Sequence, residues 1–293
     1  MLFRSNERVV RPRLADAKFF FDQDRKKTLA SRLGGLEKVV YHNKLGSQAE
    51  RSKRVSNLAK AIAAKIGDAN LAAKAEQAAQ LSKADLLTDM VGEFPELQGI
   101  MGRYYAEHEN LDSDIAFAIE DHYKPRFAGD ELPRNTVGVA VALADKLETL
   151  VGLFSIGEKP TGDKDPFALR RQALGILRML IEGKLAISFG ELIATALAQF
   201  NVDSANKAEH INAITEFCFD RLSVNLREQG ASAQEVEAVL PQLVAPSAFA
   251  GYKTVRYEKL TALLLEAIKA QQLQIDALQA QLAQLGGSAN TEL

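Results

Sequence analysis

The sequence VGVAVALADKLETLVGLF, which covers residues 137–154, decides the fold class because it is strongly apolar over the length of a helix. Its polar members are Asp145, Lys146, Glu148 and Thr149. A turn-rich connector follows the segment. The sequence therefore predicts one long apolar helix here.

Helical spacing recurs on both sides of this segment. Apolar residues from Val55 to Ile66 fall on one face of an expected helix, and Gly67 ends it. Asp165 followed by Pro166 is a typical helix start, because the carboxylate can cap free N–H groups. Further helices are expected at residues 71–90, 96–109, 113–123, 189–200 and 209–229. Ala and Leu are abundant and aromatic residues make up only 7%, so we predict an all-α fold.

Composition sets limits on function. The 293 residues carry a formal net charge of -2, so the molecule as a whole does not attract RNA or membranes electrostatically. The single cysteine, Cys218, excludes an internal disulfide and lies in an apolar helical run, where a buried, inert thiol is expected. No apolar stretch reaches membrane-spanning length and no signal peptide is recognisable. We therefore expect a cytoplasmic protein without membrane contact.

The two ends of the chain differ from the middle. Residues 1–24 include the basic stretch Arg4–Arg13 with Pro12, which predicts an extended N-terminal segment, with helical periodicity beginning near Ala15. Near the other end, apolar residues alternate in steps of four and three, which predicts a short coiled coil. These heptad positions are Leu264, Ile268, Gln271, Ile275, Leu278, Leu282 and Leu285.

Catalytic and metal motifs are weak. Residues 157–164 only superficially resemble a phosphate-binding loop, because Asp163 and Lys164 stand where Lys and Ser or Thr are required. His108 and His122 lie near carboxylates, but no helix presents two histidines four residues apart. We expect a solvent loop, partly exposed histidines, no metal and no cofactor.

Basic residues beside aromatic ones are the best binding candidates. Arg and Lys can neutralise phosphates, and aromatic rings can stack on unpaired bases. The alternative is that Tyr105 and Phe127 pack in the core while Lys124 and Arg126 are ordinary surface charges. The candidate RNA-binding residues are Arg103, Lys124, Arg126, Lys164, Arg170 and Arg171.

Four longer runs resemble one known family. They are NERVVRPRLADA (residues 6–17), LSKADL (81–86), YKPRFAGD (123–130) and KDPFALRR (164–171). Together they resemble the β subunit of the bacterial two-subunit glycyl-tRNA synthetases over about residues 6–230. In that family the α subunit carries the glycine and ATP site, and the β subunit binds tRNA and is needed for aminoacylation. The resemblance implies a β-subunit fragment that contacts glycine tRNA and the α subunit and is inactive alone.

The same resemblance places a domain similar to HD phosphohydrolases at residues 25–185. HD domains bind metal through a His, a His-Asp pair and a later Asp. These positions correspond here to Arg51, Ala84-Asp85 and Asp145, so both imidazoles are absent. Arg51 also adds a permanent positive charge. We expect a degenerate site without metal, in which Arg51 pairs with Asp85 or Asp145.

A helical extension is expected at residues 186–230, and residues 231–293 resemble something else. The runs AQEVEAVLP (233–241) and GYKTVRYEKL (251–260) resemble the C-terminal end of the intramolecular chaperone domain of phage tail spikes and fibres. That family forms trimeric helical bundles, whereas the Ile and Leu order of the heptads favours dimers. We expect self-association through these C-terminal helices, into either a dimer or a trimer. Two alternative functions remain: a non-catalytic structural or oligomerisation protein, and an HD-type phosphohydrolase, which Arg51 and Ala84 disfavour.

Overall fold

The computed structural model describes residues 2–162, 164–203, 206–231, 244–246 and 253–255. The tail-spike-like end and its coiled coil fall almost wholly outside these residues. No helix among them has the length and apolar character needed to cross a membrane.

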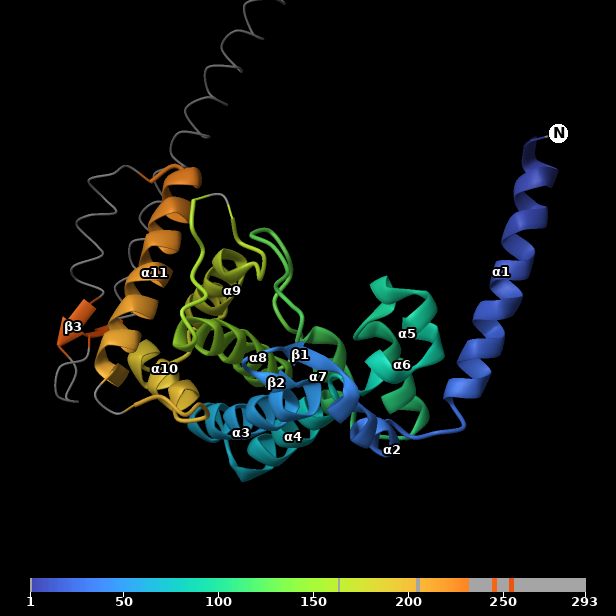
Figure 1. Ribbon diagram of the computed structural model, residues 1–293, viewed down its shortest axis with the longest axis horizontal. Helices are drawn as coiled ribbons and strands as arrows, with labels where there is room; N and C mark the ends of the chain where they lie inside the picture. Colours follow the sequence, from blue (N-terminus) through green and yellow to red (C-terminus); the bar gives the residue numbers. More distant parts are fainter. Residues whose placement is uncertain (1, 163, 204–205, 232–243, 247–252, 256–293) are drawn as a thin grey trace, which may run out of the picture.

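Helices make up most of the described chain, which confirms the predicted all-α class (Figure 1). The α-helices are α1 (Leu2–Asp24), α2 (Leu29–Arg32), α3 (Gln48–Ile66), α4 (Ala69–Leu81), α5 (Asp89–Glu93), α6 (Ile100–His108), α7 (Ser113–Asp121), α8 (Thr136–Ser155), α9 (Leu169–Glu182), α10 (Phe189–Leu197) and α11 (Lys207–Glu228). Short 3-10 helices lie at η1 (Leu33–Lys38), η2 (Ala84–Leu87) and η3 (Pro95–Leu97).

Two small antiparallel ribbons complete the described fold. One pairs β1 (Val40–His42) with β2 (Gly46–Ser47), and the other pairs β3 (Val244–Pro246) with β4 (Lys253–Val255). Both are too short to form a core of their own. They do not change the fold class.

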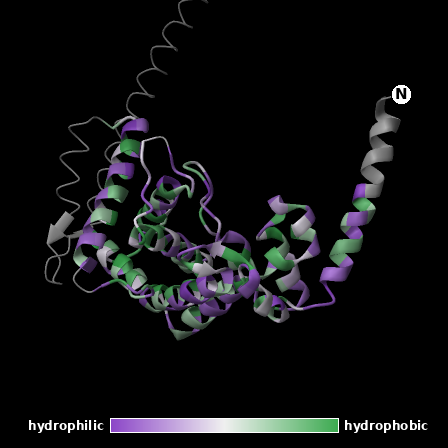
Figure 2. Ribbon diagram, in the orientation of Figure 1, coloured by the Kyte–Doolittle hydropathy of each residue, from purple (hydrophilic) through white to green (hydrophobic). Residues whose placement is uncertain are grey.

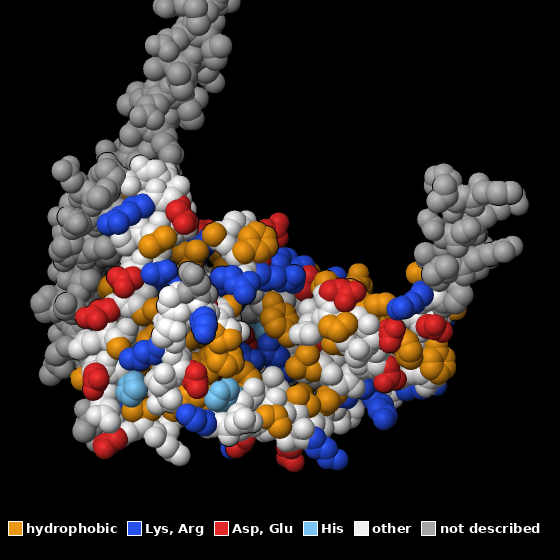
Figure 3. Space-filling model, turned by 45° about the horizontal axis from the view of Figure 1, so that its top comes forward, with side chains coloured by type: hydrophobic (Ala, Val, Ile, Leu, Met, Phe, Trp, Pro, Cys, Tyr) orange, Lys and Arg blue, Asp and Glu red, His pale blue; other side chains and the backbone are white. Residues whose placement is uncertain are grey.

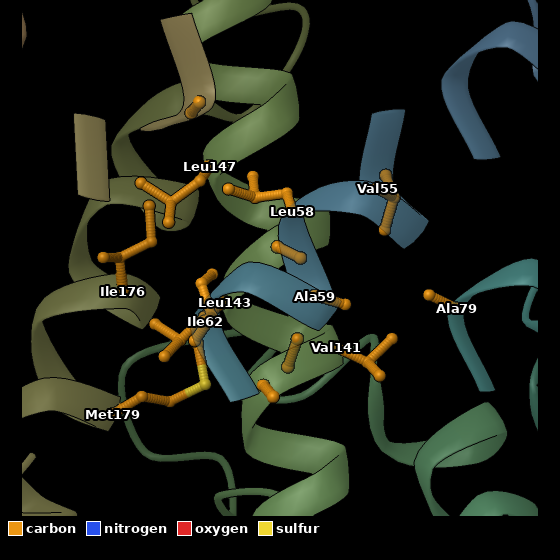
Figure 4. Close-up of a cluster of buried hydrophobic side chains, with 14 of the residues drawn as sticks. Val55, Leu58, Ala59, Ile62, Ala79, Val141, Leu143, Leu147, Ile176 and Met179 are labelled. Atoms are coloured by element: carbon orange, nitrogen blue, oxygen red, sulfur yellow. The ribbon is translucent and has the colours of Figure 1, made fainter. Parts of the chain in front are cut away.

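Helix α8 is the centre of the fold. Except for Val139, every residue from Val137 to Phe154 is buried, because α3, α4, α7, α9, α10 and α11 all pack against this helix. Figure 4 shows Leu58 and Ile62 of α3 meeting side chains of α8 and α9. Each fully buried Leu or Ile contributes about 1.5–3 kcal/mol. The outer helices are amphipathic instead, as the alternating colours along α11 show (Figure 2).

The N-terminal segment corrects one prediction, because residues 2–24 form helix α1 and not an extended strand. Pro12 removes one N–H donor, but Ala17, Phe20 and Phe21 repeat at helical spacing and lie against the core. The C-terminal part of α1 packs against α5, and the N-terminal part of α1 projects from the body (Figure 1). The helical period of the later residues therefore extends through the proline.

Two expected helices have different limits in the structure. The helix expected at 71–90 ends at Leu81, and η2 and α5 follow as separate short elements. The Asp165 carboxylate accepts from the free N–H groups of Leu169 at 2.8 Å and Arg170 at 3.0 Å, but the N-cap is Ala168, so the expected helix start at Asp165 and Pro166 is wrong. The helix itself begins at Leu169, because Ala168 adopts a left-handed conformation with φ 54°.

Candidate functional site

Arg51 ties α3 to α8 inside the protein. Its guanidinium donates to Asp145 Oδ1 at 2.9 Å, to Glu148 Oε2 at 3.0 Å and to the Thr149 hydroxyl at 2.9 Å. Glu148 is also paired with Arg54 at 2.8 Å. Burial opposes the charge on Arg51, but Asp145 and Glu148 outweigh it and raise the pKa of Arg51. The expected pairing of Arg51 with Asp145 is confirmed.

Lys83 approaches the same carboxylate from another side. Its ammonium lies 3.4 Å from Asp145 Oδ1, and it donates to His122 Nε2 at 2.7 Å. It also lies 4.0 Å from the centre of the Tyr123 ring. Burial lowers the pKa of Lys83 to about 8. Asp145 therefore has two cations against it, which hold its pKa well below the ordinary value despite burial.

His122 corrects a second prediction, because it is 0% exposed and not solvated. Its Nδ1–H donates to the Ile119 carbonyl at 2.6 Å, so Nε2 is the acceptor for Lys83. Burial and the neighbouring Lys83 ammonium hold the pKa of His122 well below its usual range. His122 is a neutral structural link between α7 and the loop that carries Lys83.

Asp85 serves a different purpose from Asp145. Its Oδ2 accepts from the backbone N–H groups of Gly99 at 2.6 Å and Gly102 at 3.3 Å. A Cβ on Gly102 would lie 2.6 Å from Ile119 Cγ2 and 3.1 Å from Asp85 Oδ2, so only glycine fits there. Asp85 thus fixes the start of α6, whereas the Arg51 guanidinium bonds to Asp145, Glu148 and Thr149 instead.

These residues do not fit a metal ion. Guanidinium and ammonium groups contact Asp145, where an HD metal centre would need neutral imidazoles and carboxylates. Ala84 offers no ligand atom, and Asp85 Oδ2 is bonded to backbone N–H groups, which leaves only the buried Oδ1 of this carboxylate without a partner. Within the described residues, no group of three or more His, Cys, Asp or Glu side chains is placed to hold a metal. The chemistry here is that of a buried ion network.

A basic pocket opens beside this network. It has a volume of about 320 Å³ and lies between η3, the loop after α7, α8 and the first turn of α9. Lys146 is only 3% exposed and donates to the Tyr123 carbonyl at 3.2 Å. Burial lowers the pKa of Lys146 to about 8. The polar and aromatic side chains in the lining are Glu96, Gln98, Tyr123, Arg126, Lys146, Arg171 and Gln172.

The structure separates the candidate RNA-binding residues into two kinds. Arg103 is paired with Glu107 at 3.0 Å and Glu120 at 2.5 Å. Lys124 is paired with Asp121 at 3.3 Å and Glu131 at 3.2 Å. Both cations are therefore largely neutralised by the protein.

The second kind faces solvent. Arg126 and Arg171 line the basic pocket and have no carboxylate partner among the described residues. Lys164 is exposed in the loop before α9, and Arg170 donates to the Gly162 carbonyl. Lys146 was missed at the sequence level, although it was visible as a charged residue inside the most apolar helix.

The aromatic candidates divide in the same way. Tyr105 is buried, and its hydroxyl donates to Asp24 at 2.9 Å, as the core interpretation expects. Phe127, in contrast, is 59% exposed, so it does not pack in the core. Phe167, which the sequence did not single out, is also exposed and lies edge-on to His42. Figure 3 shows Lys and Arg side chains gathered beside hydrophobic ones near the middle of the face presented. Basic side chains and exposed hydrophobic ones therefore lie side by side on this face.

The family model described as glycyl-tRNA synthetase beta subunit matches residues 1–241. The chain belongs to this family. It is 71% identical over 244 residues to the glycine--tRNA ligase beta subunit of Janthinobacterium sp. (strain Marseille), covering 82% of this chain and 34% of that protein. The corresponding subunits of Methylobacillus flagellatus and Thiobacillus denitrificans are each 68% identical, over 82% and 80% of this chain and 34% and 33% of their own lengths.

The chain thus spans about a third of the length of these curated relatives. The match also refines one boundary. It ends at residue 241, so residues 231–241, expected to begin the tail-spike-like end, lie within the synthetase match.

Proposed function

We propose that this chain is a tRNA-binding accessory part of the β subunit of a two-subunit, cytoplasmic glycine–tRNA ligase. It supports ATP-dependent glycyl-tRNA formation, for which the α subunit supplies the glycine and ATP chemistry. The observation that carries the proposal is the 71% identity over 244 residues to a glycine--tRNA ligase beta subunit.

The surface chemistry supports an RNA contact. Arg126 and Arg171 have no carboxylate partner in the described part of the chain, and a free guanidinium group can bind phosphate oxygens with two parallel hydrogen bonds. The exposed Phe127 ring lies next to Arg126 in the chain and offers a face for an unpaired base. Because the net charge is -2, this local surface must provide the attraction for RNA.

Binding of the pure chain to glycine tRNA and to an unrelated tRNA, across a salt series, tests the proposal. Phosphate contacts release counterions, so log K should fall linearly with log salt. Tighter binding of glycine tRNA at every salt concentration is expected. Absence of binding at low salt would contradict the proposal and favour the structural alternative.

Self-association through the C-terminal heptads belongs to the same proposal. The repeat from Leu264 to Leu285 supports it. Light scattering of the full chain should give a mass above 32.0 kDa. Replacing Ile268 and Ile275 with Lys should return the mass to that of one chain.

A further inference from the structure

The basic pocket beside α8 has an unusual charge distribution. Lys146 is buried, and it donates to the Tyr123 carbonyl, yet no carboxylate of the described residues forms an ion pair with it. Arg126 and Arg171 point two more cations at the same space, against the single carboxylate of Glu96. Burying an ammonium without an anion is costly, so an anionic ligand would stabilise this arrangement.

We propose that this pocket binds the phosphate of a single nucleotide unit, with Lys146 at its base and Arg126 and Arg171 at its rim. The proposal deepens the RNA-binding function and rests on it. A volume of about 320 Å³ is at the lower end of small-ligand pockets, which suits one nucleotide and excludes a duplex. The Tyr123 and Pro125 side chains offer apolar contact to a sugar or base.

Side chains, and not the helix end, hold the anion. Residues of the first turn of α9 line the pocket, and a free helix N-terminus attracts phosphate. Here, however, Asp165 already accepts from the N–H groups of Leu169 and Arg170. The phosphate is therefore recognised by the two guanidinium groups and the Lys146 ammonium.

Gly175 leaves room for the Lys146 side chain. A Cβ on Gly175 would lie 3.0 Å from Lys146 Cε and 3.2 Å from Cδ, so the lysine stem runs directly over this glycine. Gly175 is inside α9 with no need for an unusual backbone conformation. Gly175→Ala should therefore displace the ammonium without changing any charge.

Calorimetric titration of the full chain with AMP, adenosine and a short single-stranded RNA tests the proposal. Adenosine is the matched ligand without phosphate. Lys146→Met and Arg171→Gln should each weaken binding of AMP and of the RNA about tenfold or more, as for hydrogen bonds to charged groups. Gly175→Ala should weaken both by a smaller factor. Lys60→Gln, on α3 and paired with Glu76, is the control and should change nothing.

The outcomes distinguish an RNA phosphodiester from a free nucleotide as the ligand, and the pocket proposal from the RNA-binding function. Preference for the RNA strand over AMP identifies a phosphodiester, and comparable binding identifies a free nucleotide. Equal binding of AMP and adenosine, or unchanged binding by Lys146→Met and Arg171→Gln, overturns the pocket even if tRNA still binds. Binding of AMP without binding of tRNA supports the pocket and contradicts the RNA-binding function. If Lys146→Met fails to fold, the titration of Arg171→Gln tests the pocket, because Arg171 is exposed and its replacement should not affect folding.

Discussion

Arg51 and Asp145 form a buried ion pair of 2.9 Å that joins α3 to α8. The resemblance to HD domains assigns both positions to metal binding, and here one of them carries a cation of its own. The guanidinium also bonds Glu148 and Thr149, so one side chain joins three partners on the central helix. These contacts make Arg51 a structural link between two helices.

Removing Arg51 should therefore destabilise the fold. Arg51→Ala leaves Asp145 buried without its strongest partner, and a loss of about 3–5 kcal/mol in the free energy of unfolding is expected. Urea denaturation followed by circular dichroism measures it. Lys60→Ala, at an exposed pair on the same helix, should change stability by less than about 0.5 kcal/mol. Equal effects of the two variants would show that the buried pair is unimportant.

Metal analysis gives a second prediction. Because Arg51 and Lys83 contact Asp145, a divalent cation would meet two positive charges at this position. Protein purified without added metal should contain far less than one equivalent of zinc, manganese or iron by mass spectrometry. A stoichiometric content of any of them would refute this account of the site.

The pH dependence of stability should report on His122. Its folded pKa lies below the unfolded value of 6.5, so below that pH the unfolded chain binds a proton that the folded chain does not. The contribution of His122 to the free energy of unfolding is therefore complete above pH 6.5. It falls as pH decreases, by at most about 1.4 kcal/mol per pH unit. His122→Gln should flatten the slope between pH 6.5 and 5. The ordinary carboxylate range lies lower, so an unchanged slope would contradict this assignment.

The two basic residues of the loop after α7 should contribute unequally to tRNA binding. Arg126 has no carboxylate partner among the described side chains, whereas Lys124 is paired with Asp121 and Glu131. Arg126→Ala should weaken binding about fivefold and reduce the salt slope by about one. Lys124→Ala should have a smaller effect on both. Filter binding over a salt series measures them, and a larger effect at Lys124 would reverse the assignment.

Sequence patterns predicted the fold where burial is simple. The apolar run at 137–154 predicts a buried helix, and the spacing from Val55 to Ile66 predicts an amphipathic one. The segment around Pro12 was misread because one proline and two valines outweighed the weaker period of Ala17, Phe20 and Phe21. Once the contacts of these residues nucleate the helix, adding residues toward its N-terminus costs less than nucleation.

The site was only partly predictable. The partnership of Arg51 with Asp145 could be expected, since the resemblance to HD domains brings the two positions together and an arginine there needs a nearby anion. Lys83 and His122 could not be paired in advance, because they lie 39 residues apart and meet only through packing around α8. Lys146 was visible as a charge within an apolar helix, but its pocket depends on α9 and on the loop before it.

Asp24 should hold α1 to the body of the protein. It is 2% exposed, and its carboxylate accepts from Asp89 N and Met90 N at 3.0 Å and from the Tyr105 hydroxyl at 2.9 Å. Asp24→Ala leaves these three donors unsatisfied and removes the carboxylate partner of Arg32, which keeps its bonds to the Leu87 and Asp24 carbonyls, so stability should fall by about 3 kcal/mol or more. Limited trypsin digestion should then cut faster after the basic residues that follow α1. Asp22→Ala, which removes only the exposed pair with Lys18, should leave both stability and digestion unchanged.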